Sequence, residues 1–237
     1  MTPTPVRVIG LNGSPHRQGN TATLMGWVLE GCREAGASVE WLHLVDYHIQ
    51  YCQGCFTCLR SGACPIQDDF LEIRARLTAA DGLVLGSPVY EGGPSAQMKT
   101  LMDRLTLLHL YTQVFERQVT IGVATSGIAP TRDVALNLAD YFGRRSAWIG
   151  ATTTTLSDGI QPLAERHPLH LPAQARRMGR RLVEQIQNPG RLRLPQPFRL
   201  WIQLLRRLYI LPLMRKHPDQ FAGALRILQE KALNQVN

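Results

Sequence analysis

The first 155 residues alternate between short apolar runs and longer segments with helical periodicity. Continuous apolar runs are typical of strands buried on both faces, as in parallel sheets. The predicted strands are 6–11, 39–44, 82–86, 119–125 and 147–154, and the predicted helices between them are 21–34, 70–80, 96–111 and 131–142. Strands that alternate with helices are joined by right-handed crossovers, which place helices on both faces of the sheet. The sequence therefore predicts an α/β fold with a doubly wound parallel sheet.

The loop after the first predicted strand has the composition of a phosphate site. Ligands in such sheets bind beyond the carboxyl ends of the strands. Residues 13–21, GSPHRQGNT, combine glycine, hydroxyl and amide groups and lead into a helix. Free N–H groups and the helix dipole favour an anion there, although an ordinary turn with Asn20 or Thr21 as N-cap is an alternative. No GKS, GKT or GxGxxG pattern occurs here, which favours a mononucleotide phosphate.

Two more loops follow predicted strands. Residues 87–94, SPVYEGGP, place two prolines and two glycines around Tyr90, and Ser95 is a predicted N-cap. Such a backbone can present N–H groups to the edge of a planar ring, with Tyr90 stacked on it or lining it. The alternative is a rigid connection with Tyr90 as surface cover. A third small polar loop follows at 125–127, and three such loops on one rim indicate a ligand site.

Four of the five cysteines lie within thirteen residues, at Cys52, Cys55, Cys58 and Cys64. Spacings of two, two and five residues favour an iron–sulfur cluster. Zinc and free thiols are the alternatives, although structural zinc usually takes two close pairs separated by a dozen or more residues. Disulfides are disfavoured by the short spacing and by the lack of a signal peptide. Cys32, within a predicted helix, is expected to be a buried apolar residue.

These motifs together resemble one protein family. The stretch at 13–21, the four cysteines, the acidic pair at 68–69 and SPVYEGGPSAQMKTLMDR at 87–104 look like the iron–sulfur flavoprotein branch of the flavodoxin-like NAD(P)H-dependent FMN reductase family. The resemblance covers roughly residues 5–155. It implies a flavodoxin-like five-stranded parallel sheet with strand order 2-1-3-4-5, FMN bound by the three loops, and a [4Fe–4S] cluster held by the four cysteines.

The resemblance also assigns FMN-binding residues by motif position. The phosphate is assigned to Ser14, Arg17, Asn20 and Thr21. The isoalloxazine ring is assigned to Pro88, Val89, Tyr90, Glu91 and Gly92, and the third loop contributes Thr125, Ser126 and Gly127. No side chain is assigned a catalytic role, because neither cofactor needs a protein nucleophile or acid–base pair. Burial by Tyr51, Phe56 and Leu59 and the charge of Arg60 are expected to tune the cluster.

The predicted function is that of an oxidoreductase that moves electrons between FMN and a [4Fe–4S] cluster. A flavin exchanges two electrons or one, whereas a cluster exchanges one. NAD(P)H or a ferredoxin-like carrier is the expected redox partner. The alternative is an NAD(P)H-dependent reductase of FMN or quinone, in which the cysteines stay free or bind zinc. A redox sensor that binds nucleic acid is ranked low, and no nucleic acid partner is expected.

The chain is predicted to consist of an FMN-binding domain at 1–187 and a helical, basic extension at 188–237. The domain ends with a helix at 171–187 and includes the inserted cysteine loop at 52–64. Three prolines mark a connector at 188–197. The formal net charge is +8, and eleven Arg and Lys against one acid, Glu184, lie between residues 176 and 216. Such a region can face nucleic acid, an anionic membrane or an acidic partner.

A predicted helix at 198–211 opens the extension. Its apolar face consists of Phe198, Trp201, Ile202, Leu205, Leu208 and Tyr209, opposite a polar face of Arg199, Gln203, Arg206 and Arg207. Pro212 is expected to end this helix, and a final helix is predicted at 219–233. We expect the apolar face to be buried on the domain or in a homo-oligomer, as a dimer or tetramer, rather than on a membrane surface. No apolar run is long enough to span a membrane, and the protein is expected to be cytoplasmic.

Overall fold

The structure is a computed structural model that describes residues 5–155, 159–160, 162–189 and 197–233. The chain separates into two compact units. The first consists of Met1–His48, Ala75–Lys99 and Phe115–Leu192, and the second of Ile49–Arg74, Thr100–Val114 and Arg193–Asn237. The cysteine segment therefore belongs to the same unit as the C-terminal helices. The division into an FMN-binding domain at 1–187 and an extension at 188–237 stays a prediction.

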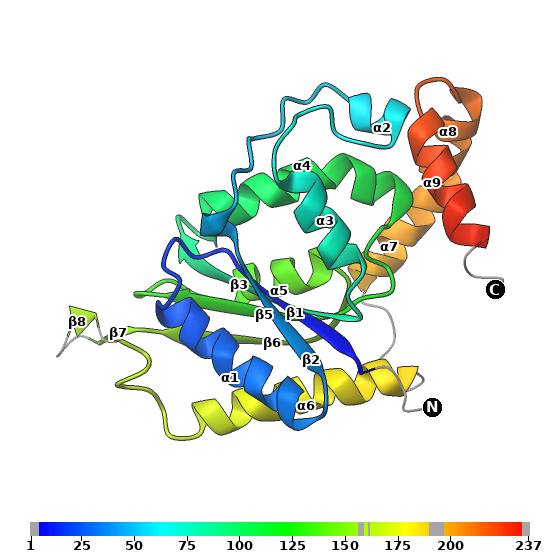
Figure 1. Cartoon of the computed structure of the whole chain (residues 1–237). Helices are drawn as coiled ribbons and strands as arrows, with labels where there is room; N and C mark the ends of the chain where they lie inside the picture. The colour runs from blue at the N-terminus through cyan, green and yellow to red at the C-terminus, as the bar shows by residue number, and fades with distance from the viewer. Residues whose placement is uncertain (1–4, 156–158, 161, 190–196, 234–237) are drawn as a thin grey trace. The chain divides into compact units, whose positions relative to one another are not determined.

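The first unit is built on a parallel sheet (Figure 1). Its strands are β1 (Arg7–Asn12), β2 (Ser38–His43), β3 (Gly82–Tyr90), β5 (Val119–Ser126) and β6 (Arg144–Thr152). They follow the order β2-β1-β3-β5-β6, and every neighbouring pair is parallel. These are the five strands predicted from the apolar runs, so the doubly wound sheet and its flavodoxin-like order are confirmed. Shorter antiparallel strands are β4 (Gly93–Pro94), β7 (Thr154–Thr155) and β8 (Gly159–Ile160).

Strand β3 continues four residues beyond its predicted end. Ser87 and Pro88 stay in parallel register with β5, and Val89 and Tyr90 pair with β4. The sequence SPVY is not a continuous apolar run, so hydrophobic patterning ended the strand at Gly86. The loop that we expected after this strand is therefore partly strand.

Helices cover both faces of this sheet. Helices α1 (Asn20–Glu34) and α6 (Leu171–Gln187) lie side by side on one face, and α5 (Arg132–Tyr141) lies on the other (Figure 1). The buried core between α1, α6 and the strands is aliphatic and includes Val84, Val119 and Ile121. The expected three-layer arrangement is therefore present.

Glycine allows α1 and α6 to approach closely. A Cβ atom at Gly31 would lie 1.9 Å from the carbonyl oxygen of Arg176, and one at Gly179 would lie 1.9 Å from that of Val28. Cys32, beside this contact, is fully buried, and its Sγ lies 3.5 Å from the Gly179 carbonyl oxygen. Burial raises the pKa of the Cys32 thiol to about 12. Cys32 is thus the buried residue that we predicted.

The second unit is helical. It contains α2 (Thr57–Ser61), α7 (Pro197–Leu205), α8 (Leu211–Lys216), α9 (Ala222–Leu233), and parts of α3 (Phe70–Thr78) and α4 (Ala96–Thr112), both of which cross the boundary between the units. Its small core consists of Leu59, Ile210, Met214, Phe221 and Ala224. The C-terminal helices therefore share a core with the cysteine segment, through Leu59.

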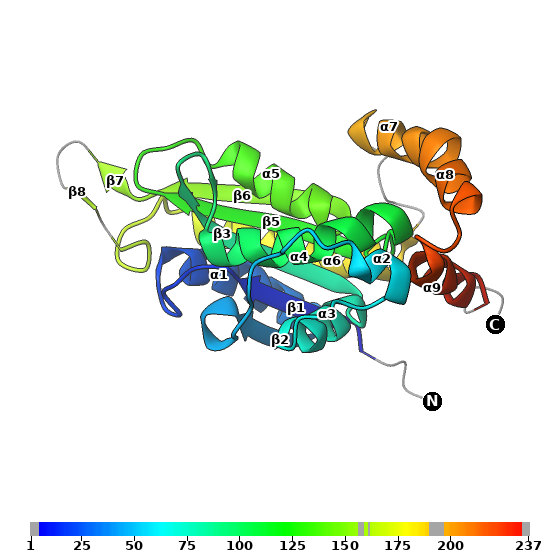
Figure 2. The same cartoon turned by 90° about the horizontal axis from the view of Figure 1, so that it is seen from above.

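The prediction that Pro212 ends the first C-terminal helix is wrong. Helix α7 continues through a π-helical turn, η3 (Arg206–Ile210), into α8, and Figure 2 shows these segments as one continuous helix. Pro212 lies inside this continuous helix, directly after the π turn, and removes one N–H from the helical hydrogen bonds. A π turn is a known way to absorb such an interruption. Residues 190–196 of the predicted connector lie outside the described residues. Among the residues that the structure does describe, no helix combines the length and apolarity that a membrane span requires.

Candidate functional site

Three loops meet at the carboxyl edge of the sheet in the first unit. They follow β1, β3 and β5, which are consecutive neighbours in the sheet. The register aligns Asn12 with Gly86, and Pro88 with Thr125. The chain runs from β1 to β2 in one direction and to β3 in the other, so the loops lie at the switch point of the sheet.

The loop after β1 is held by buried polar contacts. The Gly13 N–H donates to the Gly86 carbonyl over 2.8 Å, and Ser95 Oγ donates to the Gly13 carbonyl. The Asn12 side chain accepts from the Ser14 N–H over 3.0 Å, and Ser14 Oγ in turn accepts from the His16 N–H over 3.1 Å. These bonds fix the backbone of the loop before α1 begins.

The first turn of α1 has no side-chain cap. Gly19 is the N-cap, so the alternative in which Asn20 or Thr21 caps the helix is wrong. Asn20 Oδ1 instead accepts from the Leu163 N–H over 2.7 Å. Thr21 Oγ1 lies 2.7 Å from Thr125 Oγ1, and both residues are buried. An uncapped helix start beside two hydroxyl groups fits an anionic phosphate.

Arg17 forms an ion pair at the edge of this loop. Its guanidinium forms an ion pair with Asp46, and the Arg17 side chain is 60% exposed. His43, whose ring nitrogen lies 3.1 Å from the Asn12 amide, has its pKa lowered by burial and by the charge of Arg17, with Asp46 opposing. The positive charge predicted for the phosphate is thus shared with Asp46.

The loop after β3 is a tight hairpin. Strands β3 and β4 are joined by Glu91 and Gly92, both in the left-handed region with φ of 47° and 72°. Two consecutive residues with positive φ define a type I′ turn. Within the hairpin Val89 is buried, whereas Tyr90 is half exposed and Glu91 is exposed. Ser95 follows and caps α4 by accepting from the Met98 N–H, as predicted.

The third loop is bonded to Thr153, the residue after β6. Thr125 and Ser126 are buried, and Gly127 is exposed. The Ser126 carbonyl accepts from Thr153, from the N–H over 2.9 Å and from Oγ1 over 3.0 Å. The residues assigned to FMN that carry a hydroxyl group and are buried at this edge are Ser14, Thr21, Thr125 and Ser126, whereas Glu91 and Gly127 are exposed and Tyr90 is half exposed.

All four clustered cysteines line one pocket in the second unit. Its empty space, open mouth included, is about 350 Å³. The apolar and charged residues that line it with Cys52, Cys55, Cys58 and Cys64 include Phe56, Pro65, Ile66, Leu107, Asp103 and Arg104. Cys52 and Cys55 are exposed, and Cys58 and Cys64 are partly buried. Nevertheless, no three His, Cys, Asp or Glu side chains in the described ranges are arranged as ligands of one metal ion.

The thiols of this pocket influence one another. Burial and the charges of Cys64, Cys52 and Cys55 raise the pKa of Cys58, whereas hydrogen bonds from Thr57 lower the pKa of Cys55. Four thiolates in one pocket repel one another unless a cation neutralises them. The donor set therefore fits an iron–sulfur cluster or another thiophilic metal.

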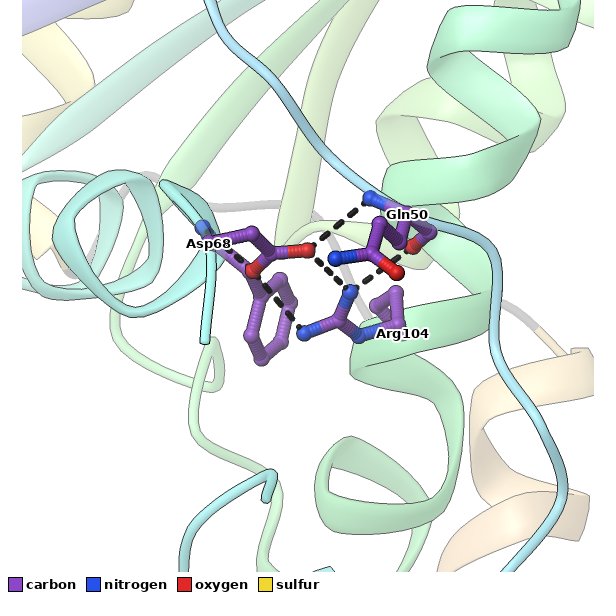
Figure 3. A network of polar contacts seen from close by, with 4 residues as sticks. Gln50, Asp68 and Arg104 are labelled. Carbon is purple, nitrogen blue, oxygen red and sulfur yellow. Dashed lines mark hydrogen bonds and ion pairs between the residues drawn. The ribbon is translucent and has the colours of Figure 1, made fainter. Parts of the chain in front are cut away.

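A buried ion pair lies against this pocket. Figure 3 shows Arg104 of α4 donating to both carboxylate oxygens of Asp68, with Nη1 2.6 Å from Oδ2 and Nη2 3.1 Å from Oδ1. Arg104 Nη1 also donates to the Gln50 carbonyl over 2.7 Å, and the Gln50 N–H donates to Asp68 over 2.9 Å. The guanidinium carbon lies 4.4 Å from the centre of the Phe70 ring. Arg104 Nε is buried without a hydrogen-bond partner in the described structure.

Helix α9 packs against α2, which carries part of the cysteine segment, and Figures 1 and 2 show the two helices side by side. A Cβ atom at Gly223 would lie 1.9 Å from the Gly62 nitrogen, so the two backbones touch. Arg226 Nη2 donates to the Ser61 carbonyl over 2.6 Å. The C-terminal region is therefore part of the scaffold of the cysteine pocket, which the sequence did not indicate.

The three residues expected to bury the cluster have different surroundings. Phe56 lines the cysteine pocket and is 56% exposed, Tyr51 is 79% exposed, and Leu59 is buried in the core of the second unit. Their role toward a cluster stays a prediction. Both aromatics precede α2 in an open stretch where Gly54 and Phe56 have positive φ. Two arginines that the sequence reasoning missed also interact with the thiols. Burial lowers the pKa of Arg104, but its hydrogen bond to Asp68 and the charge of Cys64 outweigh burial and raise the pKa. Burial lowers the pKa of Arg74, opposed by the charges of Cys58 and Cys64. The MDR triplet at 102–104 was the available signal.

Comparisons with known proteins agree with this architecture. The sequence matches the family described as NADPH-dependent FMN reductase over residues 6–157. Iron–sulfur flavoprotein MJ1083 of Methanocaldococcus jannaschii is 42% identical over 125 residues, which cover 52% of this chain and 65% of that protein. An iron–sulfur flavoprotein of Archaeoglobus fulgidus is 37% identical over 100 residues, which cover 42% of this chain and 46% of that protein. The chain thus spans less than two thirds of the length of these curated relatives.

Solved structures share the fold. The structure described as RosB with bound intermediate OHC-RP (8-demethyl-8-formylriboflavin-5'-phosphate) superposes with a TM-score of 0.61 at 14% identity, covering 85% of this chain and 87% of that one. At this identity the likeness concerns the fold alone.

Proposed function

The chain belongs to the NADPH-dependent FMN reductase family, in its iron–sulfur flavoprotein branch, and on that basis we propose that it is a flavin-dependent oxidoreductase that moves electrons between FMN and a [4Fe–4S] cluster. When bound, FMN exchanges electrons in pairs or singly and a cluster exchanges them singly, so the two together connect two-electron and one-electron carriers. The expected carriers are NAD(P)H and a ferredoxin-like protein.

In this proposal the loops of the first unit hold FMN. The uncapped first turn of α1, with Ser14 and Thr21, binds the phosphate, and Thr125 fixes the Thr21 hydroxyl from β5. Asn20 and Arg17 complete the phosphate site, and Arg17 supplies a positive charge that it shares with Asp46. The hairpin residues 88–92 and the loop 125–127 bind the ring. No side chain needs to transfer a proton.

The four cysteines of the second unit hold the cluster in this proposal. The observation that carries it is that all four thiols line a single pocket. Three arginines act on these thiols electrostatically: Arg60 on Cys55, Arg74 on Cys58 and Cys64, and Arg104 on Cys64. Positive charge beside an anionic cluster stabilises its reduced, more negative form, so these arginines raise the reduction potential.

The test is anaerobic purification of the chain with iron, sulfide, zinc and flavin quantified in the same sample. About four irons per chain together with FMN supports the proposal, as expected for a [4Fe–4S] cluster. Zinc, or FMN with no metal, contradicts it. Either of these results supports the other candidate, an NAD(P)H-dependent reductase of FMN or quinone in which the cysteines stay free or bind zinc.

Within that second candidate, the structure bears on the state of the cysteines. Two of them are exposed, and they are not arranged as the ligands of one metal ion in the part of the chain that the structure covers, which favours free thiols over zinc ligands. Because each cysteine of a [4Fe–4S] cluster binds a different iron, the same arrangement does not argue against the cluster. Steady-state reduction of FMN or a quinone by NADH or NADPH, retained when the cysteines are replaced, would distinguish it. Assembly into a homo-oligomer and a cytoplasmic location belong to the proposal in either case.

A further inference from the structure

We propose that the α7–α8 helix binds the surface of a membrane that contains anionic lipids, through an apolar stripe. The apolar stripe consists of Leu200, Trp201, Leu204, Leu208 and Tyr209, on α7 and η3. These side chains are 52%, 56%, 55%, 66% and 69% exposed, respectively. The expectation that the apolar face of this helix is buried on the domain is therefore wrong for Trp201, Leu208 and Tyr209. This inference does not depend on which cofactors the chain holds.

The stripe is a continuous helical face. Leu200, Leu204 and Leu208 are spaced four residues apart, which places them one above the other on a helix. Trp201 and Tyr209 flank this row. The residues that anchor the helix lie elsewhere on it: Ile210 and Met214 are buried in the core of the second unit. The helix is thus attached by its C-terminal part and presents the apolar stripe along its N-terminal part.

Single exposed apolar side chains are common on protein surfaces, but here five of them lie together on one helix. Five large apolar side chains within ten residues are each more than half exposed. Leucine rows flanked by Trp and Tyr are typical of helices that lie in the interface of a bilayer, with the aromatic rings at the level of the headgroups.

The positive charge of the sequence segment that contains the stripe favours a negatively charged membrane surface. No acidic residue occurs between Glu184 and Asp219, whereas that segment contains Arg191, Arg193, Arg199, Arg206, Arg207, Arg215 and Lys216. Arg207, next to Leu208, is exposed, as are Arg215 and Lys216 at the end of α8. Basic residues near an apolar helix face are attracted to anionic headgroups, and this attraction is screened by salt.

The same charges disfavour a second copy of the chain as the partner that covers the apolar stripe. A two-fold contact through the stripe would bring the same basic segment of both copies together, with no acid in the segment to pair with it. Nucleic acid could pair with exposed basic residues such as Arg207 and Arg215 but would not cover a row of leucines. Anionic lipid provides both an apolar layer and negative charge.

The experiment is co-sedimentation of the full chain, purified with its cofactors, with vesicles of phosphatidylglycerol and phosphatidylcholine in a 3:7 ratio, or of phosphatidylcholine alone. We expect at least about tenfold tighter binding to the anionic vesicles, weakening as salt is raised. Tryptophan emission should shift to shorter wavelength on binding, and Trp201→Phe should lose this shift. The double variant Leu204→Glu/Leu208→Glu should lose at least about tenfold in vesicle affinity, because it places two charges in the apolar layer.

Leu169→Glu is the matched control. Leu169 is a leucine of the first unit that is 95% exposed, and its replacement should leave vesicle binding unchanged. Equal binding to both vesicle types, or a double variant that binds like wild type, overturns the proposal. A third result would also overturn the proposal: the wild type does not bind vesicles and is an oligomer in analytical ultracentrifugation, whereas the double variant is a monomer. In that case a second copy of the chain covers the stripe. Circular dichroism and flavin absorbance of each variant confirm that it is folded.

Discussion

Arg104 and Asp68 form a two-point ion pair in which neither side chain is exposed. The carboxylate also accepts from the N–H groups of Gln50 and Phe70, and the guanidinium donates to the Gln50 carbonyl. The pair therefore joins three segments of the second unit: the chain before the cysteines, the start of α3, and α4. It fixes both ends of the segment that contains the four thiols.

Replacement of Arg104 by methionine should destabilise the protein strongly. Methionine fills similar space but leaves the Asp68 carboxylate buried without its cation, and breaking a buried pair in this way costs about 3–5 kcal/mol. The measurement is urea unfolding followed by circular dichroism. Arg60→Met, at an exposed position of α2, is the control and should change the free energy of unfolding by less than about 0.5 kcal/mol. Similar losses for both variants would contradict the role assigned to the pair.

The stability of the protein should fall in acid through Asp68. Burial alone would raise the pKa of this carboxyl, but hydrogen bonds from Arg104 and from the N–H groups of Gln50 and Phe70 outweigh it and hold the pKa below its usual value. The unfolded chain therefore binds the proton first, at about pH 4, and the stabilisation is lost as pH falls from there through the folded pKa. Asp68→Asn should be less stable at pH 7 and should lose less stability below about pH 4.

Urea unfolding at pH 7 and at several values below pH 4 tests this linkage. Asp133→Asn is the control, because the Asp133 side chain is 89% exposed on α5. Its stability should follow the pH dependence of the wild type. If Asp68→Asn also parallels the wild type, the pKa of Asp68 is not depressed in the folded protein.

Cys55→Ser should abolish iron binding and largely preserve FMN. Cys55 belongs to the second unit, whereas every residue assigned to FMN belongs to the first. The measurement is iron and flavin per chain after anaerobic purification. Cys32→Ala is the control and should keep both, because Cys32 lies in the core between α1 and α6. Loss of FMN along with iron in Cys55→Ser would show that the two sites are not separate.

The architecture of the first unit could be read from the sequence because its physical basis is local. Buried parallel strands appear as apolar runs, and helix α6 was predicted with the bounds it has, Leu171–Gln187. Strand β3 was cut short because its last residues, Ser87 to Tyr90, are held by pairing with β4 and β5, which hydrophobic patterning does not detect. Local patterning finds strands by their apolar side chains and misses residues such as Ser87 and Pro88, which are buried in the strand but interrupt the apolar run.

The surroundings of the cysteines could not be read in this way. Arg104 follows Cys64 by forty residues and meets Asp68 only through the tertiary fold, and Gly223 touches Gly62 from the opposite end of the chain. The thiol spacing was visible because all four cysteines occupy one short segment. Arg104 and Gly223 are distant in sequence from that segment, so no single window of residues shows that they meet it.

Thr21→Val should weaken FMN binding by about tenfold, because it removes one hydroxyl from the proposed phosphate site and leaves the buried Thr125 hydroxyl without its partner. The measurement is the Kd of FMN from flavin fluorescence during titration of the apoprotein. Thr23→Val is the matched control: the Thr23 hydroxyl contacts only the Gly19 carbonyl at 3.3 Å among the hydrogen bonds described, and less than about twofold change is expected. Equal affinities for the two variants would place the phosphate elsewhere.

Gly92→Ala should lower the free energy of unfolding by about 1 kcal/mol, whereas the neighbouring Gly93→Ala should change it by less than about 0.5 kcal/mol. No atom lies within 4 Å of a Cβ built at Gly92, so the only obstacle there is its φ of +72°. A Cβ at Gly93 meets only the Tyr90 carbonyl oxygen, at 3.7 Å, without a positive φ.

Glu91→Asn should stabilise the hairpin by about 0.5 kcal/mol, since Asn tolerates the left-handed conformation of a type I′ turn better than Glu. Urea unfolding of the three variants checks these signs, and equal losses at Gly92 and Gly93 would contradict the type I′ turn because backbone conformation is the main difference between the two positions.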